Sequence, residues 1–502
     1  MAGSDTLPRW DMTPVFPSLE SPEFRSAFEW AKGEIGSLQE LFDQRGVRRA
    51  EGAPASGIAP VFDEITGRLN ALYRETRTLG SYVGCFVAAD ATDDVAQSLQ
   101  SELRMARVTL DQLWSRYTAW LGTADVDALL QASAMAREHE FLVRKAQVLA
   151  RHQMADEQEH LAAELLPTGL SGWARLHSDI TALLSVPLTL NGEAQTLPMS
   201  AVRALSNDPD REVRRTAHEA ELRTWETVAV PLAAALNGVK GFQSVLHRRR
   251  GWPDDVEPTL LQNSIDRETL EAMQEACVAS FPDFRRYLHA KARALGLERL
   301  AWYDLNAPVG AGSWSYTWPE AEAFIQEQFG HYSERMAAFA ERTFRERWTD
   351  AGPRPGKEDG AFCTGLRPGE SRILMNYDGS FNSVSTLAHE LGHAYHNLNL
   401  EARAPLQART PSTLAETASI FCETLVFDAA LERAEGAERL ALLEASLQRD
   451  MMVVVDIHSR FLFEKAVFEG RARRELTPRE LNELMLDAQR QTYGDGLDPE
   501  QM

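Results

Sequence analysis

Apolar residues recur every three or four positions along most of this 502-residue chain. One such run fills EFRSAFEWAKGEIGSLQELF (residues 23–42), and another fills VAQSLQSELRMARVTLDQLWSRYTAWL (residues 95–121). This spacing gathers the apolar side chains on one face of a helix and leaves polar residues on the other. The chain is therefore predicted to be mainly α-helical, with long helices that pair through their apolar faces.

Three short segments depart from the helical pattern. LLSVPLTLNGEAQTLPM (residues 183–199) predicts a β-hairpin, because Asn191 and Gly192 accept the positive φ angles of a two-residue turn. GAFCTGL (residues 360–366) and SRILMNYDG (residues 371–379) predict two short strands. A few strands are thus expected within a helical protein.

Two stretches, GWPDDVEP (residues 251–258) and AGPRPGKEDG (residues 351–360), are rich enough in Pro, Gly and charge to join separate regions. The length suits one large body with lobes. The predicted organisation is an amino-terminal helical lobe over residues 1–190, a helical continuation opening with the hairpin over residues 191–350, and a third helical region over residues 351–502.

Two histidines lie four residues apart in TLAHELGHAYH, which follows the predicted strands. On a helix capped by Ser383, the side chains of His389 and His393 project from one face about 6 Å apart, a separation that lets both bind one zinc ion. Glu390 flanks the pair and is free to accept a proton from a water molecule that the metal activates. His396 lies about 10 Å along the axis from His389, so we expect it to lie near the site without binding the ion.

A site of this kind needs a third protein ligand. STLAETASIFCETLVFDAAL, with Ser412 as its expected cap, predicts a helix over residues 412–431 that is buried nearly all round. Glu416 and Glu423 are seven residues apart and therefore share one face of that helix, where buried carboxylates require partners. We predict that Glu416 is the third ligand and that Glu423 orients a ligand histidine through its second ring nitrogen.

The net charge of the chain argues against some classes of binding partner. It contains 52 Lys and Arg residues against 74 Asp and Glu residues, a net charge of −22 that repels nucleic acids and anionic membranes. No segment approaches the roughly 18 apolar residues that span a bilayer, and the first residues lack the pattern of a secretion signal. We expect a cytoplasmic protein that binds neither nucleic acid nor membrane, with its four cysteines as reduced thiols.

HELGHAYH followed by LAETASIFCE resembles the signature of the oligoendopeptidase F family, within the thimet-oligopeptidase-like zinc peptidases. RWDMTPVFPSLESPEF and LFEKAVFEGRARRELTPRELNELMLDAQRQTYGD resemble other parts of the same family. The resemblance implies a bilobed helical body with one zinc ion deep in a central channel that admits oligopeptides. It implies His389, His393 and Glu416 as zinc ligands and Glu390 as catalytic base. It also places Gly360, Ala361 and Phe362 near a strand that pairs with the substrate backbone.

One departure concerns the carboxy terminus. Members of the family usually continue past a YGD segment with a helix whose His and Tyr side chains stabilise the oxyanion, whereas this sequence ends at Met502. The sequence leaves three alternatives open: a fragment, a separate carboxy-terminal segment that completes the active site, or a diverged enzyme.

The function that the sequence predicts is zinc-dependent hydrolysis of internal bonds in short oligopeptides, with one zinc ion per chain. Two alternatives stay open. A zinc carboxypeptidase on a similar helical scaffold would need a cationic group that captures the terminal carboxylate of the substrate, and the sequence does not identify one. A catalytically impaired peptide-binding protein would retain the metal without turnover.

Overall fold

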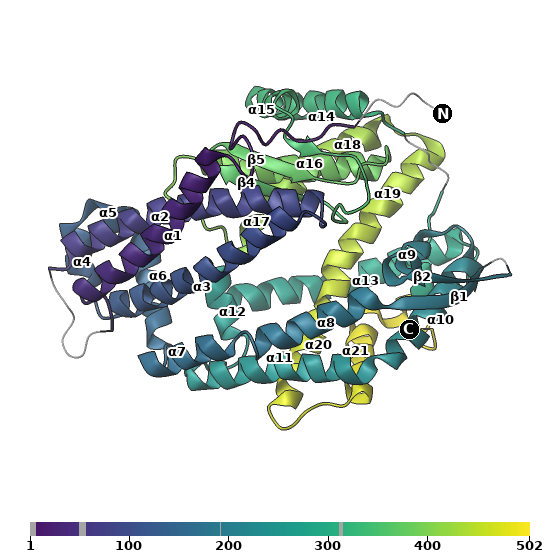
Figure 1. Cartoon of the computed structure of the whole chain (residues 1–502). Coiled ribbons are helices and arrows are strands. Elements are labelled where there is room, and N and C mark those ends of the chain that lie inside the picture. The colour runs from purple at the N-terminus through teal and green to yellow at the C-terminus, as the bar shows by residue number, and fades with distance from the viewer. Residues whose placement is uncertain (1–6, 50–56, 191, 311–314, 502) are drawn as a thin grey trace. The chain divides into compact units, whose positions relative to one another are not determined.

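The computed structural model describes residues 7–49, 57–190, 192–310 and 315–501, and most of these residues are helical (Figure 1). The predicted mainly α class is confirmed. The chain divides into two compact units, each built from two segments: unit 1 is Met1–Asp156 with Ser313–Arg433, and unit 2 is Glu157–Gly312 with Ala434–Met502. The boundaries expected at residues 190 and 350 do not coincide with the limits of these units.

Unit 1 contains two groups of helices and one small sheet. Its first group is α1 Pro22–Gln44, α2 Ala59–Ala89, α3 Asp94–Gly122, α4 Val126–Ala132, α5 Ala134–Glu138 and α6 Glu140–Arg151. Its second group is α14 Trp318–Tyr332, α15 Glu334–Arg345, α16 Phe381–Asn399, α17 Ser412–Ala415 and α18 Thr417–Arg433. Its strands are β3 Thr349–Asp350, β4 Phe362–Arg367 and β5 Glu370–Leu374.

The sheet of unit 1 joins the two groups of helices. Its strand order is β3-β5-β4, so β4 lies at one edge, and β4 and β5 form the antiparallel pair predicted from the two extended runs. Gly369, with φ of +72°, supplies the left-handed backbone of the turn between them. Leu366 of β4 is buried in the same apolar core as Phe62 and Leu69 of α2, which fixes the strand against the amino-terminal helices.

Val384, Leu387, Leu391 and Ala394 form a buried apolar stripe along α16. The expected cap was wrong by one helical turn. Ser380 caps the helix by accepting a hydrogen bond from the backbone N–H of Ser383. The Ser383 hydroxyl instead donates to Oδ1 of Asp378 at 2.6 Å, which ties down the chain just before the helix.

The segment predicted as one helix over residues 412–431 is divided at Glu416, which ends the short α17 before α18 begins. The expectation that this segment is buried nearly all round was also wrong. Leu414, Ile420 and Phe421 are 56%, 50% and 40% exposed. Figure 1 shows α16 and α18 side by side, and it is this pairing that brings the carboxylates of the divided segment to the histidines.

Unit 2 is also mainly helical. Its helices are α7 Asp156–Leu165, α8 Leu170–Leu183, α9 Met199–Ala204, α10 Arg211–Thr227, α11 Ala229–Arg249, α12 Glu257–Asn263, α13 Arg267–Ala294, α19 Gly436–Met451, α20 Ile457–Arg471 and α21 Pro478–Tyr493. Its strands are β1 Ser185–Leu190 and β2 Glu193–Pro198. It also contains the short 3₁₀ helices η1 Leu205–Asn207, η2 Trp302–Asp304 and η4 Gly494–Gly496 and the π-helix η3 Met452–Asp456.

The predicted hairpin of unit 2 is confirmed as β1 and β2, which pair antiparallel from Ser185 with Pro198 to Leu190 with Glu193. Gly192 has the expected positive φ, +84°, and Asn191 lies outside the described residues. Elsewhere in the unit, the buried Asp304 accepts hydrogen bonds from Arg211 and Arg214 of α10. No helix among the described residues of the chain is long and apolar enough to cross a membrane.

Candidate metal centre

Three side chains of unit 1 converge at the junction of α16 with α17 and α18. Nε2 of His389 lies 3.1 Å from Oε2 of Glu416, and Nε2 of His393 lies 3.2 Å from the same oxygen. One ligand atom from each residue can be chosen so that all three lie within 4.8 Å of one another. Two imidazole nitrogens and a carboxylate oxygen are a ligand set found in catalytic zinc sites, so the residues present fit a zinc ion.

A glycine between the two histidines allows the helices to come together. A Cβ atom at Gly392 would lie 2.5 Å from the carbonyl oxygen of Ala418 and 2.6 Å from Cα of Ser419. Both distances are shorter than any ordinary contact, so only glycine fits between α16 and α18 at this point. The close approach brings Glu416 and Glu423 within reach of His389.

Hydrogen bonds from neighbouring side chains hold the converging groups in place. Nδ1 of His389 donates to Oε2 of Glu423 at 3.2 Å, and Oε1 of Glu423 accepts a hydrogen bond from the hydroxyl of Ser385. A proton on Nδ1 leaves the lone pair of Nε2 facing Glu416. On the other side, the hydroxyl of Ser419 donates to Oε2 of Glu416 at 2.7 Å.

The two histidines differ in their surroundings. The hydrogen bond to Glu423 raises the pKa of His389 above its ordinary value, although burial opposes the shift. Burial lowers the pKa of His393 below its ordinary value, although the charge of Glu416 opposes the shift. His393 is therefore the more readily neutral of the two, and a neutral imidazole is the form that binds metal.

Glu390 lies beside the three converging residues and is almost completely buried, with 6% of its surface exposed. Its Oε2 atom has no hydrogen-bond partner within the described chain. Burial raises the pKa of Glu390 to about 7, although the charge of His389 opposes the shift. A carboxyl group with a pKa near neutrality can both accept and release a proton at physiological pH.

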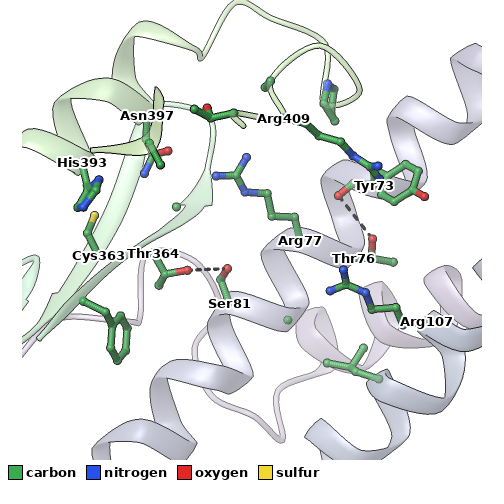
Figure 2. Close-up of a pocket in the computed structure, with 18 of the residues that line it drawn as sticks. Tyr73, Thr76, Arg77, Ser81, Arg107, Cys363, Thr364, His393, Asn397 and Arg409 are labelled. Atoms are coloured by element: carbon green, nitrogen blue, oxygen red, sulfur yellow. Dashed lines mark hydrogen bonds between the residues drawn. The ribbon is translucent and has the colours of Figure 1, made fainter. Parts of the chain in front are cut away.

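A cavity of about 1030 Å³ opens directly onto these residues, with all its lining side chains in unit 1 (Figure 2). Its size is at the upper end of the ~300–1,000 Å³ typical of ligand pockets, which suits a peptide segment. Of the three residues predicted to lie near a substrate strand, Ala361 and Phe362 line the cavity, whereas Gly360 is not among the described lining residues. His396 lines the cavity as well and lies outside the group of three that could bind a metal.

The sequence interpretation missed several residues of the cavity. Cys363 of β4 lies next to His393 in Figure 2, and burial raises the pKa of its thiol, which therefore stays protonated. A set of basic side chains also lines the cavity, and it consists of Lys32, Arg77, Arg104, Arg107 and Arg409. These residues come from α1, α2, α3 and the loop before α17, and each alone has the sequence signature of an ordinary solvated helix or loop position.

Comparisons with known proteins add independent information. The family model described as peptidase family M3 matches residues 204–501. The chain is 25% identical to oligopeptidase PepF of Bacillus subtilis over 356 residues, which cover 69% of this chain and 52% of that protein. It is 24% identical to group B oligopeptidase PepB of Streptococcus agalactiae over 508 residues, which cover 97% of this chain and 80% of that protein.

The fold is similar to that of solved structures. The structure of oligoendopeptidase-F from Enterococcus faecium matches 95% of this chain and 81% of that chain with a TM-score of 0.67, at 18% sequence identity. The chain thus spans about half the length of the Bacillus relative and about four-fifths of the Streptococcus relative and of the Enterococcus structure.

Proposed function

Because this chain belongs to peptidase family M3, we propose that it is a zinc-dependent endopeptidase that hydrolyses internal bonds of short oligopeptides. The predicted resemblance to the oligoendopeptidase F family is confirmed by the same comparisons. The observation that supports the proposed chemistry is the approach of Nε2 of His389 and Nε2 of His393 to one oxygen of Glu416, next to the buried carboxyl of Glu390.

We assign His389, His393 and Glu416 as the residues that hold the metal, one ion per chain. Zinc bound there would polarise the carbonyl group of the cleaved peptide bond and lower the pKa of a water molecule. Glu423 keeps the proton of His389 on Nδ1, so that Nε2 is free to bind the ion.

Glu390 acts as general base and then as general acid. Its Oε2, which has no partner in the described chain, accepts a proton from the attacking water and returns it to the nitrogen of the leaving amine. The raised pKa matches this double role, because a carboxylate whose acid form titrates near pH 7 is a stronger base than an ordinary solvated carboxylate. At neutral pH it can still release the proton that it has accepted. No covalent bond forms between the peptide and the protein in this mechanism.

The edge strand β4 offers a place for the backbone of the peptide. Residues 361–365 line the cavity, and among the described residues β4 has a strand partner on one side only. An extended peptide can add to such an edge through backbone hydrogen bonds, which depend little on its sequence. This mode of binding suits the expected oligopeptide substrates.

The first test is zinc content and cleavage of an internally quenched oligopeptide that is acetylated at one end and amidated at the other. The parent chain is compared with Glu390→Gln and with Glu40→Gln, a matched change at an exposed position of α1 outside the cavity. We expect one zinc ion in all three proteins. We expect a kcat at least ~100-fold lower in Glu390→Gln alone, because proton transfer by a positioned side chain contributes about that much or more.

Each other outcome contradicts part of the proposal. Equal cleavage by the parent and by Glu390→Gln would remove Glu390 from the mechanism. Cleavage restricted to peptides with a free carboxy terminus would favour the carboxypeptidase alternative. Stoichiometric zinc without cleavage of any peptide would favour the peptide-binding alternative.

A further inference from the structure

The part of the cavity beyond the metal-binding residues is strongly cationic, although the whole chain has a net charge of −22. Apart from Glu390 and Glu416, the charged residues that line it are one acidic residue, Asp111, and five basic residues, which are Lys32, Arg77, Arg104, Arg107 and Arg409. A concentration of one sign of charge in a concave site attracts ligands of the opposite sign.

Three of these basic residues already have partners. Lys32 lies 3.3 Å from Glu102, and Arg107 lies 3.9 Å from Asp111. Arg104 donates a hydrogen bond to Gln100. Arg77 and Arg409 remain, and neither forms an ion pair with any residue that the structure describes.

Arg77 extends from α2 across the cavity toward β4 and α16 (Figure 2). A Cβ atom at Gly365 of β4 would lie 2.6 Å from Nη2 of Arg77, so the missing side chain leaves room for the guanidinium against the strand. The same point lies 3.4 Å from Nδ2 of Asn397. The guanidinium therefore lies against the face of β4, next to the edge at which a peptide would pair with the strand.

Two aromatic rings hold the guanidinium of Arg409 in place. Its guanidinium lies over the rings of Tyr73 and Trp114, with Cζ 4.7 Å and 4.8 Å from the two ring centres. Stacking of this kind fixes the plane of the group. Tyr73 and Arg77 are four residues apart on α2, so both arginines lie along the same wall of the cavity. In Figure 2 Arg77 extends toward β4 and α16, whereas the guanidinium of Arg409 lies at Tyr73.

The distance between Arg77 and the metal-binding residues can be derived along the axis of α16. Asn397, next to Arg77, lies one helical turn beyond His393, or about 6 Å along the axis at ~1.5 Å per residue. An extended peptide covers that distance with about two residues at ~3.3 Å each. A group bound at Arg77 would thus belong to a residue two or three positions from the cleaved bond.

We propose that Arg77 binds a carboxylate of the peptide substrate, supplied by an acidic side chain or by a free carboxy terminus close to the cleaved bond, and that Arg409 adds positive charge to the same wall of the cavity. Arginine suits this role because its N–H donors match the two oxygens of a carboxylate. This assignment rests on the proposed peptidase function and adds a preference for acidic peptides. It is opposite to the preference for cationic peptides that the net charge of the chain alone would favour.

The test compares three kinds of quenched peptide with one common core sequence. The first is neutral and blocked at both ends, the second is blocked and contains one Glu placed two or three residues before or after the cleaved bond, and the third is neutral with a free carboxy terminus. The enzymes are the parent, Arg77→Gln, Arg77→Lys and Arg25→Gln. Arg25 is exposed on α1, outside the cavity, and gives a matched loss of charge.

For the parent we expect kcat/KM to be about 10-fold higher for a carboxylate-bearing peptide than for the neutral one. A factor of about 10 is the gain in affinity expected from one hydrogen-bonded pair of charged groups. Arg77→Gln should lower this ratio to near 1, Arg77→Lys should retain part of it, and Arg25→Gln should leave it unchanged. Preference for the internal Glu would identify a side chain as the source, and preference for the free terminus would identify the terminal carboxylate. A ratio that is the same in the parent and in Arg77→Gln would overturn the proposal.

Binding measured without turnover separates this proposal from the proposed function. Fluorescence anisotropy of the labelled peptides is followed on Glu390→Gln and on the Glu390→Gln, Arg77→Gln double variant. If no peptide is cut by the parent but the acidic peptide binds ~10-fold more tightly to the single variant than to the double variant, the carboxylate site stands and the peptidase assignment fails. Equal affinities in the two variants would contradict the carboxylate site whatever the activity.

Discussion

Nδ1 of His389 lies 3.2 Å from Oε2 of Glu423, a residue 34 positions later in the chain. The contact joins α16 to α18 and sets the face of the imidazole that points to Glu416. Ser385 supports it by donating to the other oxygen of Glu423. The orientation of this candidate ligand thus depends on a residue that would not bind the metal itself.

Replacement of Glu423 by Ala is expected to weaken zinc binding about 10-fold to 100-fold, the usual effect of losing the partner of a ligand histidine. Ser385→Ala should have a smaller effect, because Glu423 would still accept the hydrogen bond from His389. Zinc affinity measured by competition with a chromogenic chelator checks both changes. An unchanged affinity in Glu423→Ala would show that His389 needs no such support.

Replacement of Gly392 by Ala should force α16 and α18 apart. Overpacking of this kind typically costs about 1–3 kcal/mol of folding free energy, and here it should also weaken zinc binding. Gly33→Ala is the matched control, since a Cβ atom there has no neighbour within 4 Å and alanine favours a helix. Urea denaturation measures the effect on stability, and zinc titration measures the effect on zinc affinity. If Gly392→Ala were as stable as the parent and bound zinc equally well, the packing described for α16 and α18 would be contradicted.

Removal of the metal should lower the thermal stability of the protein. Zinc at 100 times its dissociation constant stabilises the folded state by about 2.7 kcal/mol if it binds the unfolded chain weakly. The parent should therefore show a fall in Tm with a chelator and a recovery on adding zinc. In His393→Ala, calorimetry should show neither the fall in Tm with chelator nor the recovery with zinc. If this variant responded to chelator and zinc as the parent does, the metal would lie elsewhere.

The pH dependence of stability should report on Asp304 in unit 2. Burial raises the pKa of Asp304, but hydrogen bonds from Arg211 and Arg214 outweigh it and lower the pKa below the ordinary value. A carboxyl group whose pKa is lower in the folded state contributes stability above its unfolded pKa of about 3.9, and that contribution is lost as the pH falls through the folded value. Asp304→Asn should therefore weaken the dependence of unfolding free energy on pH in the acid range.

The same substitution leaves Arg214, which is 3% exposed, without its charged partner, so it should also cost about 3–5 kcal/mol at neutral pH. Asp283→Asn serves as control, because the pair of Asp283 with Arg286 is exposed and such pairs contribute about 1 kcal/mol or less. Chemical denaturation of the three proteins across pH gives both quantities. Parallel pH profiles for the parent and Asp304→Asn would contradict the assigned shift.

Local patterns were sufficient to predict the helix that bears the histidines. The spacing of His389 and His393 depends only on helix geometry. The two strands before this helix were predicted as well. The cap was misplaced because Ser380 and Ser383 are equally suitable by residue type, and the hydrogen bond of Ser383 to Asp378 decides between them.

Features that depend on distant segments could not be predicted. The break at Glu416 has no proline or glycine to mark it in the sequence, and the exposed side chains of Ile420 and Phe421 look like core residues by type. Arg77 and Arg409 are 332 positions apart, and only the folding of α2 against the later elements brings them to one cavity. Their joint presence is a property of the tertiary structure.

The construction of unit 1 from two separate segments has a consequence for biosynthesis. Between Arg77 and Glu416, 338 residues (416 − 77 − 1) must be translated, and they include residues 157–312 of unit 2. At about 5–20 residues per second this interval lasts on the order of 20–70 s. During that time the growing polypeptide lacks Glu416, so the proposed zinc site cannot form until this stretch has been translated.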